Sequence, residues 1–207
     1  MRIISHRGYW QTPSEKNTVV AFQRSFDLGF GLETDLRDHL GQLVISHDIV
    51  NNGEISFSNL LSLSEKYKLL LALNIKSDGL AKLVSKAMIG YDRKNWFVFD
   101  MSIPDTLDHL AEGNPVFARM SEVEKTPVWF EQIDGIWLDS FDNQWYDLTL
   151  ISDLLNKGKQ VCVVSPELHG REYIGLWTML LPLAKEHRLI LCTDFPVKAT
   201  EHFLKGI

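Results

Sequence analysis

Residues suited to acid–base and phosphate chemistry are concentrated between positions 5 and 48 of the chain. A short apolar run bounded by glycine and polar residues is typical of a buried strand, and most of these residues directly follow such a run. Charged groups are costly to bury without a partner, so they are expected where a strand leaves the core. We therefore expect one site at the ends of several strands, built from His6, Arg7, Glu33, Asp35, His47 and Asp48.

Two histidines in this segment, His6 and His47, are suited to proton transfer, because the ordinary pKa of histidine lies near neutral pH. They fit a base and an acid on opposite sides of one phosphorus atom, with Asp48 orienting an imidazole or bonding to substrate. Arg7 can hold phosphate oxygens with its planar fork of donors. Lys76, which ends a later strand, adds a positive charge, and the alternative for it is a solvated lysine with no role in the site.

Two carboxylates, Glu33 and Asp35, alternate with Leu32, Thr34 and Leu36, which predicts that both lie on one face of a strand. Carboxylate oxygens are the ligands that Mg²⁺ and Ca²⁺ prefer, so the pair predicts a site for a divalent cation. The alternative is an exposed strand face on which they pair with Arg37.

The composition limits the kinds of protein that the chain can be. At 207 residues and 45% hydrophobic it can bury a sizeable core, and one domain over residues 1–207 is expected. A net charge of −6 with scattered lysines and arginines argues against nucleic acid as a partner, because backbone phosphates need a clustered basic surface. Cys162 and Cys192 lie inside apolar runs and are expected as buried small hydrophobes, and His109, in an expected helix, is expected at the surface.

No long apolar segment indicates a secretory leader or a membrane span. The longest apolar stretch, residues 176–184, is interrupted by Thr178 and Pro182 and is too short to cross a bilayer. We expect a cytoplasmic protein without an integral membrane segment. The sequence does not indicate an oligomeric state.

The expected strands and helices alternate, which is typical of a parallel sheet with helical crossovers. An additional short strand at residues 43–46 follows the second unit through a tight turn at residues 38–41, and segment 122–130 is a short helix or a loop. The other strands are expected at residues 2–5, 32–36, 69–75, 96–99, 116–118, 135–138, 161–164 and 189–193. Helices are expected at residues 17–28, 60–67, 80–89, 106–110, 148–155, 173–186 and 197–204.

About eight such units favour a compact (β/α)8 barrel of the TIM type over an open doubly wound sheet. No G-x-G-x-x-G motif follows the first strand, so the usual signature of dinucleotide binding is missing. Polar residues recur at strand ends, and in a barrel they would ring one mouth. These residues are His6, Arg7, Asp35, Asn74, Lys76, Asp100, Arg119, Asp139, Glu167 and Asp194.

Five short motifs together resemble the glycerophosphodiester phosphodiesterase family, within the superfamily of phosphoinositide phospholipase C-like phosphodiesterases. They are H-R-G at 6–8, N-T-x-x-A-F at 17–22, E-x-D at 33–35, H-D at 47–48 and T-D-x-P at 193–196. The resemblance is dense over residues 3–48, returns at 74–76 and 193–196, and is loose between. It implies a β/α barrel that hydrolyses phosphodiesters of glycerol or polyol head groups with help from a divalent metal.

The chain departs from this family's pattern at three places. Asn74 stands where the family has a glutamate that binds the metal, so Asn74 is expected as a third, uncharged ligand of Mg²⁺ or Ca²⁺. S-P-E-L-H-G-R at 165–171 replaces a tryptophan–threonine pair, and Glu167 is expected to replace the missing carboxylate, with His169 or Arg171 contacting substrate. The alternative there is an ordinary polar loop. A brief segment, residues 49–56, replaces a larger insertion, so the mouth is expected to be open.

Three functions remain as alternatives. The first is a metal-assisted phosphodiesterase, in which Trp10, after the H-R-G loop, flanks the substrate's head group. The second is a metal-independent phospholipase-like enzyme in which an arginine does the work of the cation; Asn74 and Arg171 favour it. The third is a barrel that only binds a phosphorylated head group. Retention of both His6 and His47 argues against the third, because binding alone does not need an acid–base pair.

Overall fold

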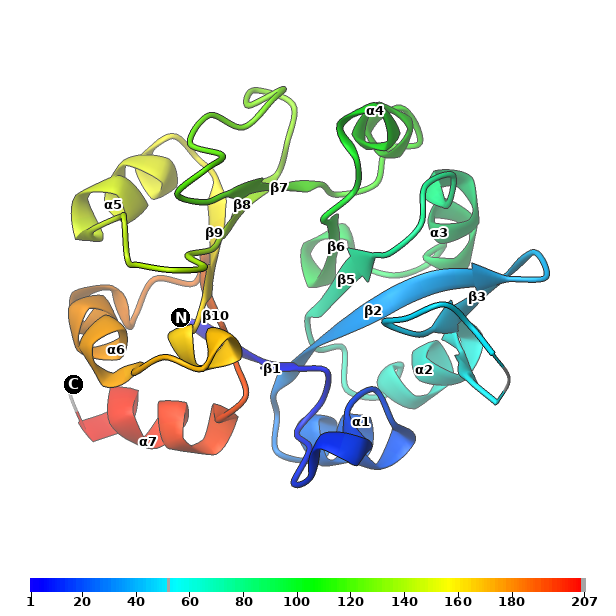
Figure 1. The fold of residues 1–207 in the computed structure, drawn as a ribbon, viewed down its shortest axis with the longest axis horizontal. Coiled ribbons are helices and arrows are strands. Elements are labelled where there is room, and N and C mark those ends of the chain that lie inside the picture. The colour runs from blue at the N-terminus through cyan, green and yellow to red at the C-terminus, as the bar shows by residue number, and fades with distance from the viewer. Residues whose placement is uncertain (52, 206–207) are drawn as a thin grey trace.

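A ring of eight parallel strands surrounded by helices forms the protein, whose computed structural model describes residues 1–51 and 53–205 (Figure 1). Parallel pairing runs through the strands in the order β6, β5, β2, β1, β10, β9, β8 and β7. The remaining gap, between β6 and β7, is crossed by one isolated bridge, in which the Val98 amide donates to the Pro115 carbonyl at 2.9 Å. The predicted TIM-type barrel is confirmed. Its strands are β1 (Arg2–His6), β2 (Gly31–His39), β5 (Leu71–Ile75), β6 (Trp96–Phe99), β7 (Phe117–Met120), β8 (Gly135–Leu138), β9 (Gln160–Val164) and β10 (Leu189–Thr193).

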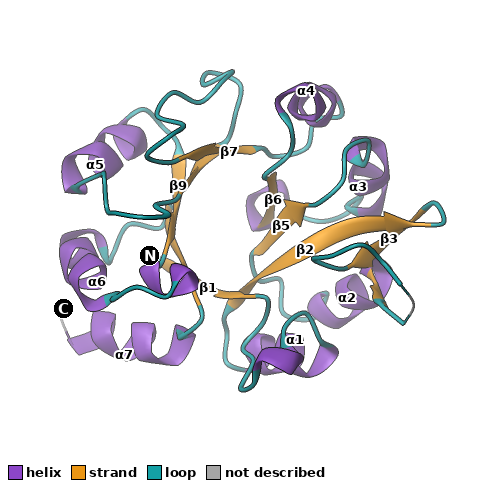
Figure 2. Ribbon diagram, viewed as in Figure 1, coloured by secondary structure: helices purple, strands orange, loops and turns teal. Residues whose placement is uncertain are grey.

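Helices cover the outside of the ring (Figure 2). Residues 121–134, between β7 and β8, contain no α-helix, so the segment left open at 122–130 is a loop. The other strands are each followed by one: α1 (Val19–Asp27), α2 (Phe57–Ser64), α3 (Ala81–Ala87), α4 (Ile103–Ala111), α5 (Leu148–Asn156), α6 (Ile174–Leu180) and α7 (Pro196–Lys205).

Helix ends differ from the predictions where capping residues decide them. Ser56 and Ser102 accept the backbone N–H three residues later and start α2 and α4 at positions 57 and 103. The long helix predicted at 173–186 is wrong beyond Leu180, because the chain tightens into a 3₁₀ turn at Leu181–Leu183 that contains Pro182.

The additional strand predicted after the second barrel strand is present. β2 continues beyond the barrel and pairs antiparallel with β3 (Gln42–Ile45), which in turn pairs with β4 (Ile55–Ser56). Leu40 and Gly41 both have positive φ, as a two-residue hairpin turn requires, so the predicted tight turn is confirmed.

Strand alternation divides the core into two parts. Inward-facing side chains fill the barrel, including stacked rings of Phe97 on Phe117 and Phe99 on Trp137, with centroids 3.7 and 3.9 Å apart. Cys162 and Cys192 belong to this filling as buried free thiols, as predicted, and burial raises the pKa of each. Outward-facing side chains pack against the helices. The filled interior leaves the mouth, at the C-terminal ends of the strands, as the place for a site.

Within residues 1–51 and 53–205, no helix combines the length and the apolar character that crossing a bilayer requires. The cytoplasmic location stays a prediction.

Candidate active site

The H-R-G loop turns sharply at the end of β1. Arg7 and Gly8 have φ of 54° and 87°, and a Cβ on Gly8 would lie 2.7 Å from the Cβ of Ala21. The next amide, of Tyr9, donates to the Ala21 carbonyl at 3.1 Å. Glycine at 8 and a small residue at 21 therefore let the loop pass directly over α1, and two of the motifs noticed in the sequence meet here.

Asn17 ties this loop to β2. Its amide group donates to Asp35 Oδ2 at 2.8 Å, and its own oxygen accepts from the Thr34 hydroxyl at 2.8 Å. The Asn17 backbone N–H donates to the Arg7 carbonyl at 2.9 Å, while Thr18 caps α1. Asn17 was predicted only as the first residue of a helix at 17–28, and its φ of 59° places it before that helix instead. Its sequence signal was its place in N-T-x-x-A-F.

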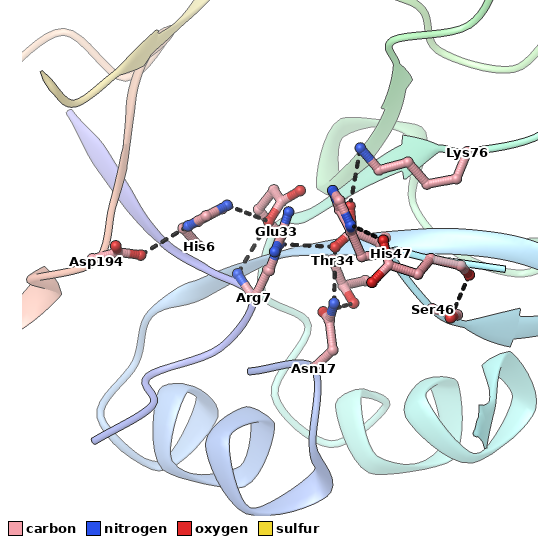
Figure 3. A network of polar contacts seen from close by, with 11 residues as sticks. His6, Arg7, Asn17, Glu33, Thr34, Ser46, His47, Lys76 and Asp194 are labelled. Carbon is pink, nitrogen blue, oxygen red and sulfur yellow. Dashed lines mark hydrogen bonds and ion pairs between the residues drawn. The ribbon is translucent and has the colours of Figure 1, made fainter. Parts of the chain in front are cut away.

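His6 lies between two carboxylates (Figure 3). Its Nδ1 lies 2.8 Å from Asp194 Oδ1, and its Nε2 lies 3.9 Å from Glu33 Oε2. With Nδ1 donating to Asp194, the lone pair of Nε2 is left for a proton from substrate. Asp194, from the T-D-x-P motif after β10, was expected at the mouth but not as the partner of His6.

Glu33 and Asp35 lie side by side on the inner face of β2, as the alternation predicted, and both are buried. Glu33 Oε2 accepts from the Arg7 backbone N–H at 3.0 Å. Arg7 Nε and Lys76 Nζ lie 2.9 and 3.3 Å from the two oxygens of Asp35, at ion-pair distance but without hydrogen-bond alignment. Burial, with a smaller contribution from Asp35, raises the pKa of Glu33 to about 7.

A cation site can be built around two oxygens of this cluster that accept no hydrogen bond. Asn74, on β5, is in register with Asp35, and the buried Oδ1 atoms of both residues have no hydrogen-bond partner. Together with Glu33 they form a set of hard oxygen donors, which fits Mg²⁺ or Ca²⁺. Among residues 1–51 and 53–205, no group of three His, Cys, Asp or Glu side chains is arranged for a metal, so the amide of Asn74 is needed to complete a set of three.

His47 stands on the open side of the site, after β3. Its segment is joined to β2 by the Ser46 amide, which donates to the Asp35 carbonyl at 3.1 Å. His47 Nδ1 lies 2.8 Å from Asp48 Oδ1, and this contact lowers the pKa of Asp48. The two side chains are 45% and 92% exposed, so this pair meets solvent far more than His6 does. In the view of Figure 3, Arg7 and Glu33 lie between His6 and His47.

The other predicted substrate contacts lie around the mouth. Trp10, in the loop after β1, has the Lys16 ammonium 4.5 Å from its ring centre. Glu167 accepts from the hydroxyls of Ser165 and Thr193 and, at 3.1 Å, from the Asp194 amide. Its carboxylate therefore joins the ends of β9 and β10 beside the partner of His6.

His169 and Arg171 form a separate group over β8. His169 Nε2 lies 2.8 Å from Asp139 Oδ1, and Arg171 donates to the Ser140 hydroxyl at 2.8 Å. These two residues are bonded to the end of β8, whereas the His6 cluster stands on β1, β2 and β5.

Comparison with known proteins finds likeness in structure alone: no family model and no curated protein matches the chain. A glycerophosphodiester phosphodiesterase from Parabacteroides distasonis aligns at a TM-score of 0.70 and 17% identity, over 99% of this chain and 97% of that one. A phosphodiesterase from Oleispira antarctica, solved with its product sn-glycerol-3-phosphate, aligns at 0.70 and 15%, over 98% and 96%.

A Ca²⁺-dependent phosphatidylinositol-specific phospholipase C from Streptomyces antibioticus aligns at 0.58 and 12%, over 98% and 95%. All three cover nearly the whole of both chains, at identities that reveal shared folds rather than shared reactions. The resemblance noticed in the motifs is therefore confirmed at the level of structure: this chain has the barrel fold of the glycerophosphodiester phosphodiesterases.

Proposed function

We propose that the protein is a phosphoric diester hydrolase that cleaves a glycerophosphodiester or a related polyol diester. The observation that carries the proposal is the placement of His6 between Asp194 and Glu33, beside Arg7 and Lys76, at the mouth of the barrel. A base, two cations and a set of hard oxygen ligands at one place match what phosphodiester hydrolysis requires. The likeness to phosphodiesterase structures supports the same reaction.

The two histidines divide the proton transfers. His6 Nε2 accepts the proton of the attacking oxygen, which belongs to water or to a substrate hydroxyl beside the phosphate. His47 gives a proton to the oxygen of the departing alcohol, so that one P–O bond forms, one breaks and the proton count balances. Asp194 and Asp48 orient the two rings through their contacts to Nδ1. Attack by a substrate hydroxyl gives a cyclic phosphate, and attack by water gives the monoester directly.

Arg7 and Lys76 hold the non-bridging oxygens of the phosphate. Glu33, Asp35 and Asn74 would hold a divalent cation, Mg²⁺ or Ca²⁺, and that ion would supply positive charge beside those oxygens. The Oδ1 atoms of Asp35 and Asn74, which accept no hydrogen bond, support this assignment. We assign Trp10, His169 and Arg171 to contacts with the rest of the substrate, and Glu167 to the support of Asp194.

A second candidate is hydrolysis without a metal. Arg7 and Lys76 already lie at ion-pair distance from Asp35, and Glu33 accepts the Arg7 amide, so two carboxylates face two cations before any metal binds. In that case the two cations alone stabilise the phosphate.

Hydrolysis of bis(p-nitrophenyl) phosphate and glycerophosphodiesters, with EDTA and then with Mg²⁺, Ca²⁺ or Mn²⁺ restored, tests both candidates. We expect turnover that EDTA abolishes and a divalent ion restores. Turnover indifferent to EDTA would favour the metal-free candidate. If circular dichroism confirms that the protein is folded and it hydrolyses none of these diesters, the proposed reaction is contradicted.

A further inference from the structure

A second group of polar side chains lies across the mouth from His6, at the ends of β6 to β9. Arg119 Nε donates to Asp100 Oδ1 at 2.9 Å, and its guanidinium lies 5.5 Å from the centre of the Phe141 ring. The Phe141 ring meets His169 edge-on at 5.2 Å, and His169 contacts Asp139 at 2.8 Å. Four strand ends thus contribute to one continuous set of contacts.

Strand alternation directs this group into the mouth. Phe117 and Trp137 fill the barrel, so Arg119 and Asp139, two positions later on the same strands, stand above that filling. β7 is four strands from β1 in either direction around the ring, which places Arg119 opposite His6. Asp100, which contacts Arg119, has a φ of 66°, in the left-handed region that residues other than glycine seldom adopt and that clusters at functional positions.

A cavity of about 640 Å³ opens beside Asp100 and Arg119. It lies between the start of α4 and residues 123–128, where β7 is not followed by an α-helix and β6 meets β7 at one bridge. The volume falls in the range of roughly 300–1,000 Å³ that is usual for small-molecule sites. Its charged lining balances, with Asp100 and Glu124 against Arg119 and Lys125.

We propose that Asp100, Arg119, Asp139, Phe141 and His169, with this cavity, form the subsite for the departing alcohol, and that the alcohol is a neutral polyol such as a cyclitol or sugar. The proposal rests on the proposed function, in which the phosphate is held by β1, β2 and β5. The departing alcohol then extends from the oxygen that His47 protonates across the mouth to the ends of β6 to β9. Hydroxyl groups both donate and accept, which suits alternating carboxylate and cationic partners beside an aromatic ring.

A cationic amine head group fits this subsite poorly. Binding such a group takes an unpaired carboxylate or several aromatic faces. Here the Asp100 carboxylate is already paired with Arg119, the Asp139 carboxylate contacts His169, and the positive charge of Lys125 offsets the charge of Glu124 on the cavity wall.

The test compares hydrolysis of glycerophosphoinositol, glycerophosphocholine and bis(p-nitrophenyl) phosphate by the wild type and by Arg119→Met. Arg93→Met is the matched control, because Arg93 forms an ion pair with Asp134, 2.9 Å away, at the opposite end of the barrel. Loss of one hydrogen bond between an enzyme's charged group and its substrate lowers kcat/KM by a factor of about 10 to 100. We expect Arg119→Met to lower kcat/KM for glycerophosphoinositol relative to bis(p-nitrophenyl) phosphate by that factor, and Arg93→Met to leave the ratio unchanged.

Asp100→Asn provides a second variant should Arg119→Met fail to fold. The proposal is overturned if both substrates are lost in parallel, if the ratio does not move, or if glycerophosphocholine is preferred by the wild type. If the wild type hydrolyses no diester, the proposed reaction fails, and saturation-transfer NMR with myo-inositol decides the subsite separately. Binding that Arg119→Met abolishes would support the subsite, and no binding by the wild type would overturn it.

Discussion

At the scale of single residues, the two histidines of the site have unequal surroundings. The His6 side chain is 15% exposed and paired with a carboxylate that is 10% exposed, whereas His47 and its partner Asp48 face solvent. A shielded, oriented imidazole suits the base that activates a nucleophile. A solvent-exposed imidazole suits the acid, which must protonate a departing alcohol and then take up a new proton from water.

Asp194→Asn tests the orienting role directly. The amide keeps the size of the side chain but loses the charge that stabilises a protonated His6, so we expect kcat to fall by about 10²- to 10⁴-fold with a smaller change in KM. Asp153→Asn, an exposed position on α5, serves as the control. Equal kcat for Asp194→Asn and the wild type would rule out this role.

The sequence predicted some of these residue contacts and missed others, for a physical reason. Alternation along one strand is local, so it predicted correctly that Glu33 and Asp35 share a face. The contacts of His6 with Asp194 and of Asn17 with Asp35 depend on which strands lie side by side, β1 beside β10 and β1 beside β2, and the pattern within one strand does not reveal its neighbours. The strand ends indicated the mouth, but not which side chains meet there.

At the scale of elements, buried polar side chains fasten α4 to its neighbours. The Asn114 amide donates to His109 Nδ1 and to the Ala81 carbonyl, both at 3.0 Å, while His109 Nε2 faces Asp105 at 3.5 Å. The expectation that His109 lies at the surface is wrong, since the residue is fully buried. Sequence periodicity predicted the helix. It did not reveal that the Asn114 amide and the Asp105 carboxylate contact the two nitrogens of the buried His109 imidazole.

This cluster predicts a pH dependence of stability. Burial lowers the pKa of His109 below its ordinary 6.5, against a smaller opposing effect of Asp105. Below pH 6.5 the unfolded chain therefore binds a proton at His109 that the folded chain resists. The contribution of the buried, neutral His109 to the free energy of unfolding is complete above pH 6.5 and is lost as the pH falls below it. We expect the free energy of urea unfolding to fall more steeply below that pH in the wild type than in His109→Gln, by up to about 1.4 kcal/mol per pH unit.

His187→Gln is the control for this measurement, because His187 is exposed. It is expected to keep the wild-type slope. Identical slopes in the wild type and His109→Gln, measured from about 2 units below the ordinary histidine pKa to about half a unit above it, would mean that His109 does not resist protonation in the folded state.

At the scale of the whole molecule, the barrel separates stability from chemistry. Aromatic and aliphatic side chains fill its centre, and polar groups from eight strands converge at one end. The alternation of strands and helices predicted this architecture because each unit repeats the same pattern. The helix that is absent after β7, and the cavity beside it, were not predictable, since residues 121–134 carry no period that separates a loop from a short helix.

The central claim is that this mouth hydrolyses a phosphodiester with His6 as a catalytic residue. The most direct measurement compares turnover of a glycerophosphodiester and affinity for sn-glycerol-3-phosphate in His6→Ala, in His187→Ala and in the wild type. We predict that His6→Ala lowers kcat by at least about 10²-fold while its affinity for sn-glycerol-3-phosphate stays near that of the wild type, with His187→Ala unaffected in both. Wild-type turnover by His6→Ala would contradict the claim.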